Sequence, residues 1–168
     1  MGKRSDFKRN KSDKYRTPPN GMTPLRPFLT PGATFIDPCA GDGRIARYIP
    51  GCVQQFDLEP DDLFIAIGDA LSANLTPCDY ICTNPPWSRN VLHPMITRFR
   101  SHAPTWLLFD ADWAYTKQAA PFMIYCRYVV AVGRLKWFPD SKDHGKDSCA
   151  WYLFDKEPCT TIFVSRTA

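Results

Sequence analysis

Short apolar runs recur along the chain, separated by polar turns and by segments with helical spacing. Runs of four to eight apolar residues bounded by turn-forming residues are typical of buried strands. The pattern predicts strands at residues 33–36, 53–57, 63–67, 78–83, 106–109 and 127–132, a hairpin formed by 135–138 and 150–154, and an edge strand at 161–164.

Three segments between these runs are expected to be helices: 44–49, 91–99 and 113–125. In 91–99 the apolar side chains share one face, and Arg98 and Arg100 lie away from that face. An apolar stripe of this kind packs against a core while the opposite side meets solvent. Strands that alternate with helices predict an α/β fold.

Four polar side chains end successive predicted strands or follow them closely: Asp37, Asp57, Asp69 and Asn84. Any one of these acids could simply cap a helix or turn, which is the commoner role of a single residue. In open α/β sheets, however, the carboxyl ends of the strands form the edge at which ligands bind. Four such side chains in succession therefore predict a ligand site at this edge.

The turn after the first strand contains the pattern Gly41-x-Gly43-x-x-Ala46, which satisfies the dinucleotide fingerprint. In that fingerprint a pyrophosphate rests on the start of the following helix. Asp37 and Asp42 flank the turn, and their negative charge disfavours a pyrophosphate. They favour a ligand that carries an ammonium group and no phosphate, such as S-adenosylmethionine. NAD stays open as the alternative, because glycine motifs of this length are weak signals.

The tetrapeptide Asn84-Pro85-Pro86-Trp87 follows the predicted strand at 78–83. Prolines fix φ and have no N–H, so this corner is stiff and extended. Such a corner can offer a side-chain amide oxygen and a main-chain carbonyl to a planar exocyclic amine, and can stack a ring on the same group. An ordinary turn at the end of a strand is the alternative, since the chain contains sixteen prolines.

Together these motifs resemble class I S-adenosylmethionine-dependent methyltransferases, in particular the amino-group branch typified by N6-adenine DNA methyltransferases. The resemblance implies a Rossmann-like, mostly parallel seven-stranded sheet with an antiparallel C-terminal hairpin and helices on both faces. The matching residues are Tyr15-Arg16-Thr17-Pro18-Pro19, Asp37-Pro38-x-x-Gly41-Asp42-Gly43, Asp57, Gly68-Asp69-Ala70 and Asn84-Pro85-Pro86-Trp87, in that order along the chain.

The resemblance also implies a role for each motif. The corner from Asn84 to Trp87 is expected to be catalytic, Asp57 to hold the ribose of the cofactor and Asp69 its adenine. Asp37 and Gly41 are expected at the methionine end, over which the Tyr15 segment closes. The full set of expected contacts to S-adenosylmethionine, and to its product S-adenosylhomocysteine, is Tyr15, Thr17, Pro18, Asp37, Pro38, Gly41, Asp42, Gly43, Asp57, Leu58, Asp69, Ala70 and Asn84.

The activity implied is methyl transfer to N6 of adenine in DNA, with the base flipped out of a duplex or in a single strand. RNA adenine and protein glutamine methyltransferases use the same corner, because each modifies an sp² nitrogen. An NAD-binding oxidoreductase and a non-enzymatic cofactor-binding module are the further alternatives. Small chains of this kind resemble forms found in phages and prophages.

Charge is concentrated in residues 1–16, which hold seven basic and two acidic side chains. This arm is expected to be flexible, and a basic arm can contact a phosphate backbone, although a solubilising tail is the alternative. Residues 17–168 are expected to form a single catalytic domain without a separate target-recognition domain, so sequence specificity should be short or weak. The expected nucleic-acid contacts are Lys8, Arg9, Lys11, Arg89, Lys142, His144 and Lys146.

Several classes of protein are disfavoured by composition. No apolar run approaches the length of a membrane span, and no hydrophobic stretch follows the charged N-terminus. The seven cysteines include no Cys-x-x-Cys pair and have no histidine at a metal-ligand spacing, so we expect reduced thiols and no metal site. The expected location is the cytoplasm of a bacterium or of a phage-infected cell.

Overall fold

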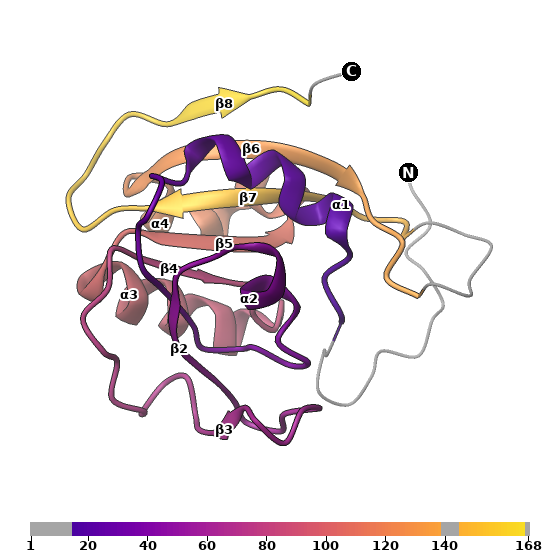
Figure 1. The fold of residues 1–168 in the computed structure, drawn as a ribbon. Helices are drawn as coiled ribbons and strands as arrows, with labels where there is room; N and C mark the ends of the chain where they lie inside the picture. Colours follow the sequence, from indigo (N-terminus) through magenta and orange to yellow (C-terminus); the bar gives the residue numbers. More distant parts are fainter. Residues whose placement is uncertain (1–14, 139–144, 167–168) are drawn as a thin grey trace.

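The computed structural model describes residues 15–138 and 145–166, which contain one mixed sheet of eight strands with helices on both faces (Figure 1). The spatial order of the strands is β3-β2-β1-β4-β5-β7-β6-β8. The strands are β1 (Phe35–Asp37), β2 (Cys52–Asp57), β3 (Ala66–Ile67), β4 (Tyr80–Thr83), β5 (Thr105–Asp110), β6 (Cys126–Arg134), β7 (Ser148–Phe154) and β8 (Ile162–Val164).

Only β7 runs against its neighbours among these strands, since it pairs antiparallel with both β5 and β6, whereas the other pairs are parallel. The expected α/β class, mostly parallel with an antiparallel C-terminal part, is therefore confirmed. The described residues form eight strands where the resemblance implied seven, and the outermost of them, β8, is the edge strand expected at 161–164, paired with β6.

Helical segments cover both faces of the sheet. In Figure 1, α1 and α2 lie in front of it and α3 lies behind it. Their bounds are α1 (Pro19–Met22), the 3-10 helix η1 (Thr23–Phe28), α2 (Arg44–Tyr48), α3 (Arg89–His102), the 3-10 helices η2 (Ala111–Tyr115) and η3 (Lys117–Ala119), and α4 (Ala120–Met123).

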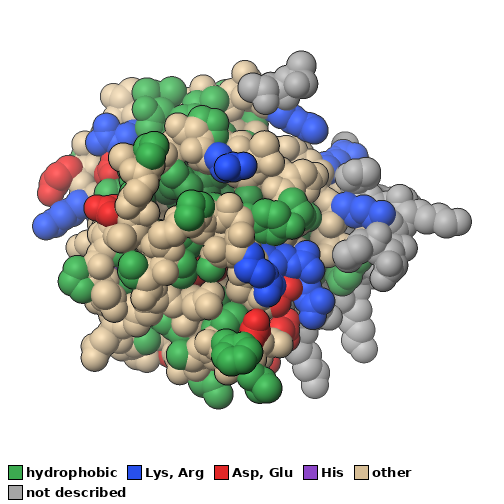
Figure 2. Space-filling model, viewed as in Figure 1, with side chains coloured by type: hydrophobic (Ala, Val, Ile, Leu, Met, Phe, Trp, Pro, Cys, Tyr) green, Lys and Arg blue, Asp and Glu red, His purple; other side chains and the backbone are tan. Residues whose placement is uncertain are grey.

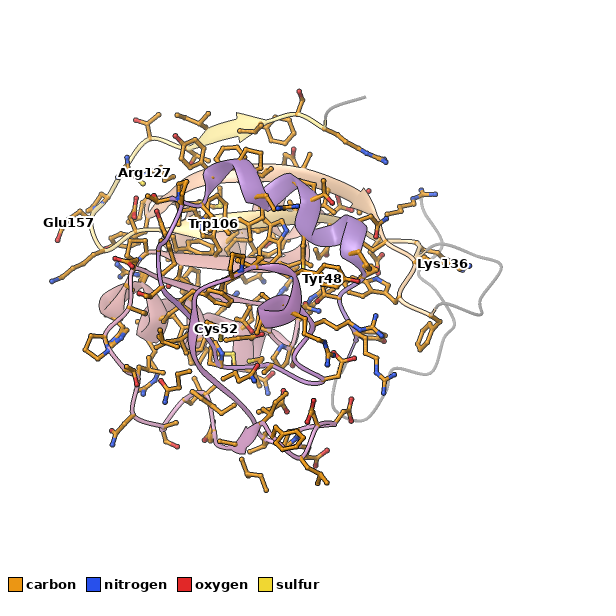
Figure 3. All side chains as sticks on the ribbon, in the orientation of Figure 1. Tyr48, Cys52, Trp106, Arg127, Lys136 and Glu157 are labelled. Carbon is orange, nitrogen blue, oxygen red and sulfur yellow. The ribbon has the colours of Figure 1, made fainter. Side chains whose placement is uncertain are left out.

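Strand β5 shows how one sequence pattern produces two cores. Its side chains alternate between the faces, so Trp106 and Leu108 join the cluster under α1 and α2, while Leu107 and Phe109 join the cluster under α3. Figure 3 shows Trp106 between the sheet and the N-terminal helical segment, where its ring lies 5.7 Å from that of Phe28. Because both faces are covered, the central residues 106–109 of the strand are all apolar, as the sequence predicted.

The predicted strand at 63–67 is wrong for most of its length, because only Ala66 and Ile67 pair with β2. The preceding residues form a turn in which Asp62 accepts hydrogen bonds from the amides of Phe64 and Ile65. Leu63 and Phe64 are consequently exposed, and of these turn residues only Ile65 is buried. Periodicity alone could not distinguish an exposed apolar turn from a buried edge strand.

The predicted hairpin partner at 135–138 is also wrong. The partner of β7 is β6, which extends to Arg134 and pairs with β7 along its whole length. Leu135 instead packs in the core near α1, and its carbonyl accepts a hydrogen bond from the amide of Gly145. The helix expected over 113–125 is divided into η2, η3 and α4, since Thr116 has extended backbone angles.

Candidate active site

A cavity of about 750 Å³ lies at the carboxyl ends of β1, β2 and β4. This is the edge at which the sequence predicted a ligand site, and the volume lies within the range of small-molecule sites. Eleven of the residues expected in the site line it: Tyr15, Thr17, Pro38, Gly41, Asp42, Asp57, Leu58, Asp69, Ala70, Asn84 and Pro86.

Other residues of the site were not expected from the sequence, or lie outside the cavity. The additional lining residues are Arg16, Cys39, Ala40, Arg44, Ile45, Glu59, Asp61, Ser88, Val91 and Met95. Most of them are close in sequence to an expected site residue, and that closeness was the only signal available. The expected contacts that are not part of the lining are Pro18, Asp37, Gly43, Pro85 and Trp87.

The glycine turn is held by the carboxylate that ends β2. The amide of Gly41 donates to Asp57 Oδ2 over 2.9 Å, and the amide of Glu59 donates to Oδ1 over 2.9 Å. Gly43 is the N-cap of α2 and has φ of +74°, a conformation that favours glycine. Asp57 therefore joins the turn to β2 while it lines the cavity.

Asp69 has a similar double role next to β3. Its Oδ1 accepts from the amide of Leu71 over 2.9 Å, and its Oδ2 accepts from Ser72 Oγ over 3.3 Å. The residue thus caps a turn, which was the alternative reading from the sequence, and it also lines the cavity. The two readings are compatible, because a carboxylate that accepts one hydrogen bond per oxygen keeps further acceptor capacity.

Asp37 lies behind the cavity rather than in its lining, and it is fully buried. Its Oδ1 accepts from Thr83 Oγ1 over 2.7 Å and from the Cys39 amide over 3.4 Å. Its Oδ2 is buried without a hydrogen-bond partner among the described residues. Burial raises the pKa of the Asp37 carboxyl to about 7, although the two hydrogen bonds oppose this and the nearby Asp57 and Asp42 add to it.

The negative charge of Asp42 is paired with three arginines, which the sequence did not suggest. Arg44 Nε donates to Asp42 Oδ2 over 2.9 Å, Arg16 Nε lies 3.6 Å from the same oxygen, and Arg47 pairs with Oδ1 at 3.8 Å. In Figure 2 basic and acidic side chains lie against one another on this part of the surface. The turn itself therefore does not present a bare negative charge.

The cavity as a whole is nevertheless acidic. Five carboxylates line it, against the two guanidinium groups of Arg16 and Arg44: Asp42, Asp57, Glu59, Asp61 and Asp69. Opposite charges in a partly enclosed site attract one another, so this lining favours a cationic ligand and disfavours a pyrophosphate.

Asn84 stands at the end of β4 with hydrogen bonds to both ends of its amide. Nδ2 donates to the Tyr15 carbonyl over 3.1 Å and to Thr17 Oγ1 over 3.2 Å. Oδ1 accepts from Trp87 Nε1 over 3.3 Å. The N-terminal segment that the sequence placed near the cofactor therefore also contacts the expected catalytic residue.

An aromatic cluster adjoins the corner. The Trp137 ring centroid lies 5.8 Å from that of Trp87 and 5.7 Å from that of Tyr15, and Phe138 lies 6.0 Å from Tyr15. Sequence reasoning missed Trp137 and Phe138, because their apolar run was read as a strand. The structure joins Trp87, Trp137, Tyr15 and Phe138 in one cluster of rings.

The expected nucleic-acid contacts are only partly within the described residues. Arg89 is exposed at the start of α3, and Lys146 is exposed just before β7. Lys8, Arg9, Lys11, Lys142 and His144 lie outside the described residues. Within residues 15–138 and 145–166, no group of three or more His, Cys, Asp or Glu side chains could hold a metal ion. In the same ranges no helix has the length and apolar character needed to cross a membrane.

Comparison with known proteins gives structural likeness only. No family model matches the sequence, and no curated protein matches it. A presumed RNA methyltransferase from Pyrococcus horikoshii has a TM-score of 0.62 at 15% identity, with 92% of each chain covered. A dimethyladenosine transferase from Plasmodium falciparum has a TM-score of 0.57 at 14% identity, covering 84% of this chain and 63% of that one.

The M protein of the type I restriction enzyme EcoKI is also similar, with a TM-score of 0.54 at 10% identity. The match covers 84% of this chain and 44% of that protein, so this chain spans less than half of it. The chain therefore has the Rossmann-like fold of S-adenosylmethionine-dependent methyltransferases.

Proposed function

We propose that this protein is an S-adenosylmethionine-dependent methyltransferase that modifies an exocyclic amine, with N6 of adenine in DNA as its acceptor. One observation carries the proposal. Asn84 and Pro86 of the Asn-Pro-Pro-Trp corner line the same cavity as Gly41 of the glycine turn and Asp57 of β2. A donor site and an acceptor site on one cavity are what a direct group transfer requires.

The residues present fit the cofactor. The acidic lining suits a cation, and the Asp57 carboxylate is placed to accept from ribose hydroxyls beside the Gly41 amide. Asp69 and Ala70 offer an acceptor and a small apolar side chain for an adenine. Asp37 would act from behind the turn, where ionisation of its carboxyl, whose Oδ2 has no hydrogen-bond partner among the described residues, would place a negative charge near the methionine end. When bound, S-adenosylmethionine supplies a methyl group on a sulfonium that leaves as a neutral thioether.

The corner would activate the acceptor. An adenine amine is a poor nucleophile because its lone pair is delocalised into the ring. If Asn84 Oδ1 and the Pro85 carbonyl accept its two hydrogens, the nitrogen moves toward sp³ geometry and its lone pair becomes available. The new N–C bond gives the nitrogen a positive charge, and its proton then leaves to solvent, so no strong base is needed. Trp87 would stack on the base, which offsets part of the few kcal/mol lost on unstacking.

The aromatic cluster favours a nucleobase over a glutamine side chain. Trp137 lies beside Trp87, and Tyr15 and Phe138 extend the cluster from Trp137, and flat rings of this kind hold bases by stacking. The neighbours include a presumed RNA methyltransferase and the M protein of a type I restriction enzyme, so the fold does not decide between RNA and DNA as the acceptor. We choose DNA because the order of the motifs resembles that branch, with RNA adenine as the second candidate.

The remaining parts of the proposal concern organisation. Residues 17–168 would form the catalytic domain and residues 1–16 a basic arm that contacts the phosphate backbone together with Arg89 and Lys146. The sequence specificity of the transfer would be short or weak. A DNA substrate of this kind would place the protein in the cytoplasm of a bacterium or of a phage-infected cell.

The test is methyl transfer by the full chain from tritiated S-adenosylmethionine to double-stranded DNA, single-stranded DNA, RNA and protein. Nucleoside mass spectrometry then identifies the product, and N6-methyladenine in DNA is the expected result. Transfer to RNA or protein alone would support the methyltransferase activity and show that DNA is not the acceptor. If the chain binds NAD and neither S-adenosylmethionine nor S-adenosylhomocysteine, the proposal is wrong.

A further inference from the structure

The segment Tyr15–Thr17 crosses the cavity and is attached on both sides of it. On the side of the corner, the Tyr15 carbonyl and Thr17 Oγ1 accept both contacts of Asn84 Nδ2. On the side of the glycine turn, Arg16 lies 3.6 Å from Asp42 and 3.7 Å from Asp61. All three residues of the segment line the cavity. We call Tyr15–Thr17 the N-terminal strap.

We infer that the N-terminal strap positions the Asn84 amide, and that Thr17 is a positioning residue for methyl transfer as well as part of the cavity wall. The inference rests on the proposed function, because it concerns the atom that would accept the target amine. A side-chain amide can turn by 180°, which exchanges its oxygen and its nitrogen. Only one of the two orientations offers Oδ1 to the acceptor.

The partners of Asn84 permit a single orientation. A main-chain carbonyl such as that of Tyr15 can only accept, and an indole N–H such as that of Trp87 can only donate. If the amide turned, its oxygen would face the Tyr15 carbonyl and its NH₂ group would face the Trp87 N–H. The Thr17 hydroxyl could accept or donate, and in this network it accepts the second Nδ2 hydrogen.

Thr17 is itself held firmly in place. Its side chain is buried, and its methyl group lies beside Gly21, where an added Cβ would be 3.4 Å from it. The following residue is Pro18, which restricts Thr17 to extended backbone angles. Pro18 is the N-cap of α1, and its carbonyl accepts from the Gly21 amide over 2.9 Å. The Thr17 hydroxyl is therefore a preorganised acceptor rather than a mobile one.

The strap also connects the cofactor side of the cavity with the acceptor side. A cofactor in the cavity would contact the strap, and the strap contacts Asn84, the residue proposed to bind the target amine. The alternative role for Thr17 is direct contact with the methionine end of the cofactor, as the sequence resemblance implied. The two roles predict different losses when the hydroxyl is removed, because one concerns turnover and the other concerns cofactor affinity.

The experiment compares Thr17→Val, which keeps the methyl group and replaces the hydroxyl by a second methyl, with Thr17→Ser, which keeps the hydroxyl. For Thr17→Val, kcat with both substrates saturating should fall at least about tenfold, the scale of one lost preorganising hydrogen bond. The Kd of S-adenosylhomocysteine by calorimetry should stay within about threefold, a difference below 1 kcal/mol. Thr17→Ser should restore kcat to within about threefold of the wild type. Thr23→Val is the matched control, since the Thr23 hydroxyl contacts the Pro19 carbonyl in the next turn of chain.

A second readout does not depend on activity. The side-chain NH₂ signals of Asn84 in a ¹⁵N-labelled sample should show one proton that exchanges faster with water in Thr17→Val than in the wild type. Arg16→Ala should have the same effect more weakly, because it releases the strap at its exposed end. It serves in place of Thr17→Val if that variant does not fold.

The outcomes separate the two ideas. Unchanged kcat with a weakened Kd for S-adenosylhomocysteine would make Thr17 a cofactor contact and overturn the inference. Unchanged Asn84 NH₂ exchange in the variants would also overturn it. If the wild type transfers methyl to no acceptor, the proposed function fails, and the NH₂ exchange measurement alone then decides whether the strap orients Asn84.

Discussion

The indole N–H of Trp87 donates to Asn84 Oδ1 over 3.3 Å, so the oxygen proposed to receive the target amine already has a donor. A carbonyl oxygen has two lone pairs, and an incoming amine must use the second or displace the indole. Trp87 also packs edge-on against Trp137, with an angle of 76° between the rings. The tryptophan therefore combines two functions, since its ring can stack and its N–H occupies the acceptor atom.

Replacing Trp87 by Phe should separate these two functions. Trp87→Phe keeps an aromatic face and frees Asn84 Oδ1, so KM for the acceptor should fall by about twofold to tenfold, the value of one ordinary hydrogen bond. Trp87→Ala should instead raise KM by at least about tenfold, because stacking on an aromatic ring contributes about 1–3 kcal/mol per base. Steady-state kinetics on an adenine-containing oligonucleotide measures both. Equal losses in the two variants would contradict the competition between the indole and the amine.

Removal of the Asn84 side chain should affect turnover and leave cofactor binding intact. Asn84→Ala should lower kcat by about a hundredfold or more, which is typical of one lost hydrogen bond to a developing charge. The Kd of S-adenosylhomocysteine should change by no more than about threefold, a difference below 1 kcal/mol. Single-turnover kinetics with labelled donor measures the rate, and calorimetry measures the Kd of S-adenosylhomocysteine. A variant that keeps more than about a tenth of the wild-type rate would refute the catalytic assignment.

The residues at the carboxyl edge could be predicted because the signal for each is local. Asp57 and Asn84 directly end or follow a short apolar run, and parallel strands bring such positions together without further information. The contact between Thr17 and Asn84 joins residues 67 positions apart, and no spacing in the sequence indicates it. Trp137 was misplaced because the apolar run of 135–138 reads as a strand of its own, while nothing in the sequence indicates that β6 continues through a register shift at Gly133 to Arg134.

Gly43→Ala should lower both stability and cofactor affinity. Gly43 has φ of +74°, and an added Cβ would lie 3.2 Å from Ile65 Cδ1 and 3.4 Å from Gln55 Oε1. The left-handed backbone costs about 1–2 kcal/mol for an L-residue, and the contacts add to this cost at the turn that faces the cavity. Urea denaturation and calorimetry with S-adenosylhomocysteine give the two quantities.

Gly32→Ala is the matched control for this substitution. Gly32 has φ of +80°, but its added Cβ would meet nothing within 4 Å, and the residue lies outside the cavity lining. Its free energy of unfolding should fall by a similar backbone cost of about 1–2 kcal/mol, with no change in cofactor affinity. A loss of affinity in Gly32→Ala equal to that in Gly43→Ala would show that the glycine turn has no specific role.

The buried Asp37 should make the stability of the cofactor-free protein fall as pH rises. The pKa of its carboxyl is about 7 in the folded protein and near the ordinary 3.8 when unfolded, so the folded state binds the proton more tightly. The stabilising contribution is therefore complete below about pH 4 and is lost as pH rises toward about 7, at about 1.4 kcal/mol per pKa unit. Asp37→Asn cannot ionise, and its Oδ1 can still accept from Thr83. Urea denaturation at about pH 5 and about pH 8 should show a smaller drop for Asp37→Asn than for the wild type. An equal drop in both proteins would mean that the Asp37 carboxyl is already ionised throughout this range. The ammonium group of the cofactor would then not be needed to stabilise its negative charge.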